Sequence, residues 1–422
     1  MRKNAWLGVL VGCGVLLSAF VAVLAQRAEQ ARDLTERSLR LLRPPLSEAG
    51  SLRDIRAREA REMLEEAETL SEDGERKTLL VEARSLELYA RGEYERTARF
   101  LAESGVNDPR LGLVAAAVAL ARGNGPAAQA ELDRLPPELQ SDPRVLLARS
   151  DVARALGRAD LALTAAESGI ARSSGSAAAY ERRGLARELL GDKAAARADL
   201  ERAAQQDRRS SSAWLALGRM HRSAGEHAAA VLAFHEATQR NPNDAEAWLG
   251  SGVCRAALGD GVSARNDLER AATLEPKRIE PLIALADLDI AERNLGAALR
   301  RYRAAVLLDP SNALGHIKLG NALMRGGDID AAIPQYKSAI EQQPDMAAAH
   351  NGLGAAFAAK GDLAGAETEL SAAAKLDPAD AHPWLNLARV YKRRGDHAGE
   401  QSALEHARER DPQLALASSQ SK

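Results

Sequence analysis

The side chains with the clearest capacity for chemistry are eight histidines and two cysteines. Imidazole and thiolate groups bind zinc when three or four ligands stand at suitable spacing. His221, His227 and His235 have no carboxylate or cysteine partner at that spacing. His316 and His350 stand where other parts of the chain carry tryptophan, so we interpret them as core residues of a repeat. Three more stand near the C-terminus and are expected to be solvated: His382, His397 and His406. The sequence therefore predicts no metal site.

The cysteines and the familiar catalytic motifs give no other chemistry. Cys13 stands in an apolar stretch and Cys254 in a helical pattern, so no internal disulfide is expected. The sequence has no Walker-type phosphate loop, no Gly-x-Ser-x-Gly elbow and no His-Glu-x-x-His. The net charge of −2 gives no overall attraction to nucleic acid or anionic lipid. We therefore predict no catalytic residue and no cofactor, and expect that the chain is not an enzyme.

Similar residues recur along the chain every 34 residues, as in the step from Trp214 to Trp248. We count positions within the repeated unit from Ser211, so that Trp214 is position 4, Gly225 position 15 and Pro242 position 32. The same residue types recur in neighbouring units, and glycine fills position 15 in most of them: Gly123, Gly157, Gly191, Gly225, Gly259, Gly327, Gly361 and Gly395. Nine units fit between residues 109 and 414 without insertion or deletion. Such a register predicts a repeat protein.

Each unit is predicted to be a pair of helices. In the first helix, Trp214, Leu217 and Gly218 follow helical spacing, as do Ala230 and Phe234 in the second. The turn glycine is expected in the left-handed conformation that ends a helix. Where Arg293 replaces it, we expect the neighbouring Asn294 to take that conformation. One unit is too small to bury its apolar face alone, so the units must stack.

This pattern of small and large residues resembles the tetratricopeptide repeat (TPR). The resemblance implies an all-α, right-handed solenoid of helix–turn–helix repeats. From Tyr180 onward, all nine aromatic residues stand at positions 4, 11 or 24, the core positions of such a repeat. None is then spare to stack on bases, so we predict no nucleic-acid partner.

The resemblance also implies that a peptide or protein partner lies in a concave groove lined by the first helices. Family positions 2, 5, 9 and 12 point into that groove. Carried over to this sequence, and joined by one neighbouring arginine, they give the predicted groove residues: Arg219, Arg222, Glu246, Glu280, Asp287, Asn321, Asn351, Arg389, Lys392 and Arg393. The groove would be acidic near its middle, polar at the two asparagines and basic toward the C-terminus. Asparagine can hydrogen-bond a peptide backbone whatever its side chains.

The N-terminus differs from the rest of the chain. Residues 5–25 carry no charge and as a helix would span about 30 Å of hydrocarbon, so we predict a transmembrane anchor or uncleaved signal. Two alternatives remain: cleavage after Ala25, and a lipoprotein modified at Cys13. Gly8 and Gly12 form a Gly-x-x-x-Gly pair that can pack two membrane helices, which would make the chain a homo-oligomer.

The remaining segments complete the predicted organisation. A short tail covers residues 1–4, a charged stalk 26–50, a helical region with a divergent repeat 51–108, the nine repeats 109–414 and a disordered tail 415–422. The short Arg2–Lys3 tail favours repeats on the exported, periplasmic side, although arginines also follow the anchor.

Our first functional hypothesis is a membrane-tethered scaffold that recruits a protein partner. The composition, rich in alanine, arginine and glycine, suggests a bacterial source. In bacterial relatives of this kind, typical roles are envelope, pilus or secretion-complex assembly. The alternatives are a structural oligomerising membrane protein and an accessory subunit that orients a catalytic partner.

Overall fold

The computed structural model describes residues 81, 85, 88–89, 93–105, 111–208 and 210–411. The predicted anchor at 5–25 with Gly8 and Gly12, the stalk at 26–50 and the tail at 415–422 lie outside these residues. Among the described helices, none is both long and apolar enough to cross a membrane.

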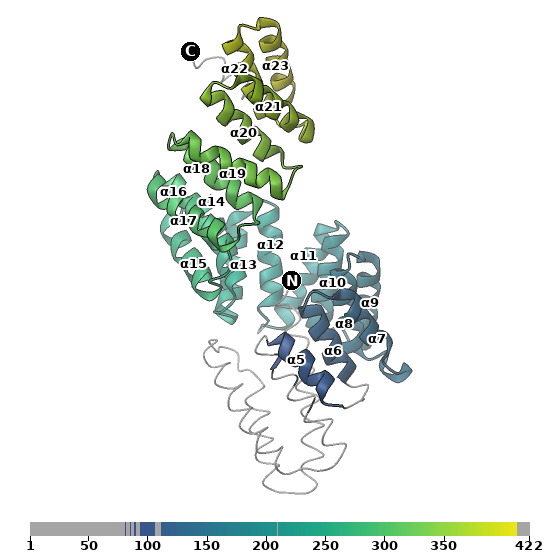
Figure 1. The fold of residues 1–422 in the computed structure, drawn as a ribbon. Coiled ribbons are helices and arrows are strands. Elements are labelled where there is room, and N and C mark those ends of the chain that lie inside the picture. Colours follow the sequence, from purple (N-terminus) through teal and green to yellow (C-terminus); the bar gives the residue numbers. More distant parts are fainter. Residues whose placement is uncertain are drawn as a thin grey trace. The chain divides into compact units, whose positions relative to one another are not determined.

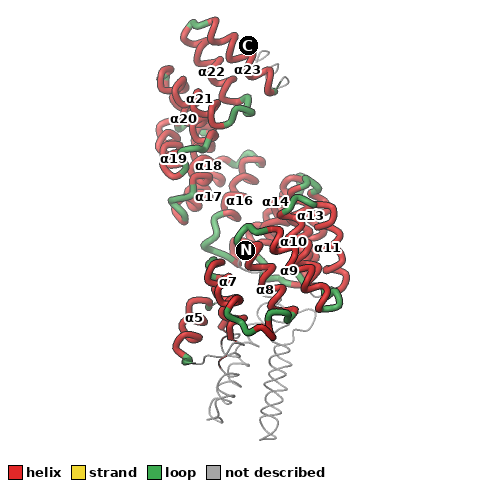
Figure 2. Tube along the Cα trace, turned by 90° about the vertical axis from the view of Figure 1, so that its right-hand side faces the viewer, coloured by secondary structure: helices red, strands yellow, loops and turns green. Residues whose placement is uncertain are grey.

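The chain divides into two compact units, residues 1–258 and residues 259–422. The described part of both units is entirely helical, with no strand (Figures 1 and 2). This confirms the predicted all-α fold of paired helices. The helices of the first unit are α5 (Tyr94–Glu103), α6 (Leu111–Ala121), α7 (Gly125–Asp133), the short 3-10 helix η1 (Pro137–Leu139), α8 (Pro143–Ala155), α9 (Ala159–Arg172), α10 (Ala177–Leu189), α11 (Lys193–Gln206), α12 (Ser212–Ser223), α13 (His227–Arg240) and α14 (Ala245–Ala257).

The second unit continues the alternation of first and second helices. Its first helices are the even-numbered ones and its second helices the odd-numbered ones: α15 (Gly261–Leu274), α16 (Glu280–Ala291), α17 (Leu295–Leu308), α18 (Ala313–Arg325), α19 (Ile329–Gln342), α20 (Ala347–Lys360), α21 (Leu363–Leu376), α22 (His382–Arg394) and α23 (His397–Arg410). From α16 to α20, each first helix packs on its own second helix and on the next first helix.

The turns between paired helices follow the glycine pattern with one exception. Gly225, for example, has a φ of 75°, and the other turn glycines of the repeats are also left-handed. At the exception, Arg293 itself takes the left-handed conformation with a φ of 61°. Asn294, for which we predicted that conformation, instead caps α17 by accepting a hydrogen bond from the backbone of Ala297. That prediction was wrong because Asn294 is the N-cap of α17 and has a φ of −94°. The left-handed residue of this turn stands one position earlier, at Arg293.

The core repeats the same arrangement in both units. Phe234 is fully buried, and a Cβ atom added to Gly218 or Gly250 would stand only 2.6 or 2.4 Å from its ring. In the second unit, Tyr336 occupies the same position 24, and its ring meets Gly320 and Gly352 in the same way. The large ring therefore fills the space left by two glycines on successive first helices, and a side chain at either glycine would have to displace the ring.

In three repeats, the side chain at position 4 joins the unit to the turn before it. Trp248 is half-buried, and its Nε1 donates a hydrogen bond to the carbonyl of Pro242 at 2.9 Å. The Nε2 atoms of His316 and His350 lie 3.1 and 3.0 Å from the equivalent proline carbonyls, which confirms that these histidines replace tryptophan in the repeat. The side chain thus contributes a hydrogen bond as well as apolar area.

Candidate partner-binding surface

In the first unit, the first helices carry charges that are buried. Arg182 on α10 is 3% exposed, and its Nε donates to Asp151 of α8 at 3.2 Å. Glu181, also 3% exposed, accepts a hydrogen bond of 2.8 Å from the hydroxyl of Ser212. We call Asp151, Glu181, Arg182 and Ser212 the buried charge cluster. Apart from Arg182 at position 6, its members occupy positions that the resemblance assigns to the groove. The sequence reasoning passed over them although the repeat register leads directly to them.

The pKa values of two members of the buried charge cluster, Glu181 and Arg182, are shifted. Burial raises the pKa of the Glu181 carboxyl, and the neighbouring charge of Arg182 opposes this shift only in part. Burial alone would lower the pKa of the Arg182 guanidinium, but the charges of Asp151 and Glu181 raise it. Because each group is already held by another part of the protein, the cluster is an internal support for the stacked helices.

Three predicted groove residues lie in this unit. Arg219 of α12 and Glu246 of α14 form an ion pair with 3.2 Å between Nη1 and Oε1, so they neutralise each other. Arg222 stands one turn further along α12 and is exposed. Of the three, only Arg222 offers a charge that no described carboxylate pairs.

The predicted acidic middle is largely neutralised in the second unit. Asp287 of α16 accepts a hydrogen bond from the hydroxyl of Tyr302. Both of its oxygens also lie 3.0 Å from Nζ of Lys318 on α18. Burial and the hydrogen bond to Asp287 raise the pKa of Tyr302, so that phenol stays protonated and donates. Asp287 therefore links two neighbouring repeats and is not free for a partner.

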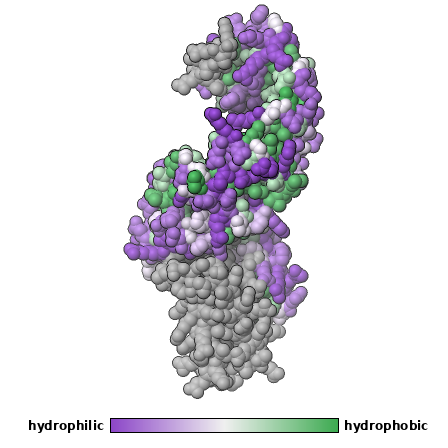
Figure 3. All heavy atoms as spheres, turned by 90° about the vertical axis from the view of Figure 1, so that its left-hand side faces the viewer, coloured by the Kyte–Doolittle hydropathy of each residue, from purple (hydrophilic) through white to green (hydrophobic). Residues whose placement is uncertain are grey.

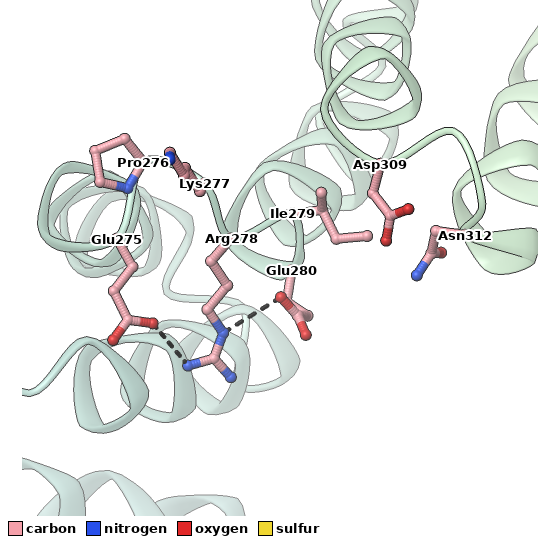
Figure 4. Close-up of a pocket in the computed structure, with 8 residues that line it drawn as sticks. All are labelled: Glu275, Pro276, Lys277, Arg278, Ile279, Glu280, Asp309 and Asn312. Carbon is pink, nitrogen blue, oxygen red and sulfur yellow. Dashed lines mark hydrogen bonds and ion pairs between the residues drawn. The ribbon is translucent and has the colours of Figure 1, made fainter. Parts of the chain in front are cut away.

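Glu280 stands apart from the other predicted groove residues, in a hollow between two inter-repeat turns (Figure 4). The hollow measures about 680 Å³. Its lining comes from the turn before α16 and the turn before α18: Glu275, Pro276, Lys277, Arg278, Ile279, Glu280, Asp309 and Asn312. Arg278 bridges Glu275 and Glu280 with two contacts of 3.3 Å. Glu280 is thus exposed but already partnered.

The last three first helices carry the remaining predicted residues. The Oδ1 atom of Asn321 on α18 accepts a hydrogen bond of 2.7 Å from the hydroxyl of Tyr336. On α20 and α22, Asn386 donates its Nδ2 to Oδ1 of Asn351 at 2.9 Å, and its own Oδ1 accepts from Arg389 at 2.9 Å. The structure therefore brings Asn351 and Arg389 together through Asn386, a residue that the sequence reasoning missed because it stands at position 6.

These three consecutive first helices also lack acidic residues, as α6 and α12 do in the first unit. None of α18, α20 and α22 contains an aspartate or glutamate, whereas α19, α21 and α23 each contain at least two. Several of the cations are used internally: Lys318 pairs with Asp287, Lys360 with Asp330 and Arg394 with Glu367. Arg393 donates to the carbonyl of Ala358 and so ties α22 to α20.

Apart from Arg393, whose guanidinium donates to the Ala358 carbonyl, three exposed cations on these helices have no ion pair among the described residues: Arg325, Arg389 and Lys392. Together with Asn321, Asn351 and Asn386 they define what we call the donor face. Arg325 was not among the predicted groove residues, and the absence of acidic residues from its helix is the sequence signal that would have found it.

Other surface features offer less to a partner. The most exposed of the large apolar side chains, Leu232, Val262 and Leu307, lie on second helices. Figure 3 shows how hydrophobic patches alternate with hydrophilic ones on one side of the molecule. Within the described ranges, no group of histidine, cysteine and acidic side chains could hold a metal ion.

Comparison with known families agrees with this architecture. A family model described as "Tetratricopeptide repeat" matches residues 190–237 and 215–278. A second model, described as "Cilia and flagella-associated protein 70 C-terminal domain", matches residues 279–410. The chain is therefore similar to both, and residues 190–278 match the tetratricopeptide repeat.

One solved structure has a similar fold at low identity, and two others are similar with lower TM-scores. A chain of the APC/C hetero-tetramer Cut9–Hcn1 is 16% identical, with a TM-score of 0.51 over 98% of this chain and 88% of that chain. Yeast Tom70 is 14% identical, with a TM-score of 0.48 over 93% of this chain and 96% of that chain. YrrB, described as a TPR protein with an unusual peptide-binding site, is 19% identical with a TM-score of 0.36, over 44% of this chain and 97% of that chain. No curated protein sequence matches the chain.

Proposed function

We propose that this chain is a non-enzymatic scaffold that binds a peptide or protein partner on the first helices of its tetratricopeptide repeats. The observation that carries the proposal is the donor face on α18, α20 and α22. Its cations Arg325, Arg389 and Lys392 are exposed without a described carboxylate, although acidic residues are frequent elsewhere in the chain. Charges left unpaired on a repeat surface suit an external partner.

The predicted groove residues divide into two groups under this proposal. Those that keep a role in binding are the ones with spare hydrogen-bonding or charge capacity: Arg222, Asn321, Asn351, Arg389 and Lys392. Those already held by other side chains or by backbone support the fold instead: Arg219, Glu246, Glu280, Asp287 and Arg393. The site is thereby concentrated in the last three repeats.

We propose further that residues 5–25 tether the scaffold to a membrane, with the repeats on the exported, periplasmic side. The support is that this whole run is uncharged and follows a short basic tail. Packing of Gly8 against Gly12 of a second copy would make the tethered protein a homo-oligomer. A role in envelope, pilus or secretion-complex assembly follows from the resemblance to membrane-anchored bacterial TPR proteins.

Affinity capture from the native organism's detergent extract tests the binding proposal. The full chain serves as bait beside a variant with Arg389→Glu and Lys392→Glu. A matched control places Lys375→Glu and Arg408→Glu on second helices, where both side chains are exposed. We expect a partner that is held by the unchanged chain and by the control but lost by the donor-face variant. A partner held equally by all three would place the function elsewhere in the chain.

A second experiment tests the tether. Membranes that contain the full chain are washed with alkaline carbonate and then treated with protease from the periplasmic side. The proposal expects the chain to resist extraction and its repeats to be digested. Release by carbonate, or protection of the repeats in intact spheroplasts, would contradict the anchor or the orientation respectively.

A further inference from the structure

The balance of free hydrogen-bond donors and acceptors on the donor face depends on the internal hydrogen bonds of its three asparagines. The side-chain oxygen of Asn321 is occupied by Tyr336, that of Asn351 by Asn386 and that of Asn386 by Arg389. An asparagine amide has an oxygen with two acceptor lone pairs and an amino group with two donors. Each of these oxygens accepts one hydrogen bond inside the protein and keeps one lone pair, so the N–H donors outnumber the acceptor sites that remain for a ligand.

The charged residues of the donor face add further hydrogen-bond donors. Arginine and lysine carry donors and no acceptor. Arg325, Arg389 and Lys392 therefore extend the donors of the amides, and α18, α20 and α22 contain no carboxylate that could receive a ligand's own donors. A ligand that binds through these donors supplies acceptors, and negatively charged acceptors would make the strongest hydrogen bonds.

Small side chains on α20, in the middle of the donor face, allow a ligand to approach the helix closely. Between the flanking helices, α20 presents Ala355 and Ala358, which are half-buried and small. A polypeptide backbone can approach such a floor without displacing side chains. Its carbonyl oxygens would then meet the amide N–H groups, while its side chains reach the cations.

We propose that the partner segment bound by the donor face is an extended, internal stretch of polypeptide rich in aspartate and glutamate. This inference rests on the proposed binding function and names the chemistry of its ligand. Nucleic acid is the competing polyanion, but single strands are held largely by stacking on exposed aromatic rings. The aromatic rings near the face are used elsewhere: Tyr336 is buried in the core, and the half-buried Tyr391 donates its hydroxyl to Glu367.

Binding of synthetic probes to the full chain tests the proposal by fluorescence anisotropy. The probe is a dye-labelled peptide of alternating glutamate and alanine, blocked with acetyl and amide groups so that it has no terminal charge. A matched peptide replaces glutamate by glutamine, and an oligothymidylate of similar length represents nucleic acid. Each probe is measured at several salt concentrations, because an ionic contact between exposed groups weakens as salt screens it.

Two variants with the same change in net charge localise the binding. The donor-face variant combines Arg325→Gln, Arg389→Gln and Lys392→Gln. The control variant combines Arg303→Gln, Lys375→Gln and Arg408→Gln, which lie exposed on second helices. We expect the acidic peptide to bind the unchanged chain and the control alike, and the donor-face variant roughly tenfold or more weakly. The glutamine peptide should bind the unchanged chain roughly tenfold more weakly than the acidic one.

Several outcomes would overturn the inference. One is equal weakening in both variants, since this would reflect net charge and not the donor face. Another is affinity that does not change with salt, a measurement on the unchanged chain that needs no variant to fold. A third is oligothymidylate binding that is tighter than peptide binding and depends on the same three residues. If the acidic peptide fails to bind while the captured partner still requires Arg389 and Lys392, the scaffold function stands and only the acidic segment is wrong.

Discussion

The two units differ in how residues at positions 5 and 9 are used, although Asp287 at position 9 of the second unit is also paired internally. In the first unit, positions 5 and 9 place Glu181 and Asp151 in a buried cluster whose members satisfy one another. In the second, Asn351 and Arg389 stand at positions 5 and 9 with donors still free for a ligand. Charge at a groove position is therefore not evidence of recognition by itself. Burial and internal pairing decide whether such a residue supports the stack or meets a partner.

Removing the arginine from the buried charge cluster should have the largest effect. Arg182→Met removes the cation that pairs with both Asp151 and Glu181 and leaves Asp151 only the more distant Arg154, at 3.7 Å. We expect a loss of about 3 kcal/mol in the free energy of unfolding, the lower end for a broken buried ion pair. Arg389→Met in the second unit should change it by less than about 0.5 kcal/mol, since the side chain is exposed. Urea unfolding measures the change in free energy for both substitutions. Hydrogen exchange of individual helices shows which unit is affected. Equal losses for the two substitutions would remove the distinction between the units.

Filling the glycine beside a core ring should have a smaller effect, and a similar one in both units. A Cβ atom at Gly250 would lie 2.4 Å from the Phe234 ring, and one at Gly352 would lie 2.3 Å from the Tyr336 ring. We expect alanine at either site to cost about 1–3 kcal/mol through overpacking. The same unfolding assay checks this. A marked difference between the sites would show that the two units differ in core packing as well as in surface chemistry.

Neutralising Glu181 should make the first unit less sensitive to pH. Burial raises the folded-state pKa of this carboxyl above its ordinary value of 4.5, so the unfolded chain releases the proton first as the pH rises. The stability gained from the protonated form is complete below the unfolded pKa and is lost as the pH rises through the folded pKa. Glu181→Gln keeps an acceptor for Ser212 and should be more stable than the unchanged chain by about 1 kcal/mol at neutral pH.

Thermal unfolding between pH 4 and pH 8 gives the test of that substitution. The advantage of the variant should grow as the pH rises. An advantage that shrinks with rising pH would mean that Glu181 is held as a carboxylate by Arg182, and that the cluster is a conventional ion pair. Asn351→Asp at the equivalent position of the second unit is the matched change, and we expect no comparable pH dependence because that side chain is only half-buried.

The left-handed arginine at the turn after α16 should give the smallest effect. A residue with a Cβ atom is destabilised by about 1–2 kcal/mol in this conformation, and the greater freedom of glycine in the unfolded chain offsets part of that difference. Arg293→Gly should therefore stabilise the second unit by about 0.5–1 kcal/mol in the urea unfolding assay. Gly327→Arg, at the next turn, is the reverse change and should destabilise by a similar amount. A loss of stability in Arg293→Gly would mean that the arginine side chain makes a compensating contact.

Much of the architecture could be predicted from the sequence because it depends on residues close together in the chain. The paired helices, the left-handed turn at Gly225 and the ring of Phe234 beside Gly218 all follow from the residue types within one unit. The error at Arg293 and Asn294 was also local, since the sequence does not show that the asparagine is needed as a helix cap.

The candidate site could be predicted only in part because it depends on the next repeat. Asp287 was expected to be an acidic groove residue, but Lys318 on the following first helix neutralises it. Asn386 and Arg325 were missed because the resemblance marks positions and not the pairing across them. Whether a charge is paired or free is set by the stacked neighbour, and the sequence of a single repeat does not contain that information.

The hydroxyl of Tyr336 connects the interior of the protein to its choice of ligand. The ring is a core residue, enclosed between two glycines, yet its hydroxyl fixes which end of the Asn321 amide faces outward. Tyr336→Phe would preserve the packing and leave the amide free to rotate, so the surface could then offer the amide oxygen with both of its lone pairs free. A substitution invisible from outside would thus alter the range of accepted partners, and drift in the core of such repeats can supply new binding preferences before any exposed residue changes.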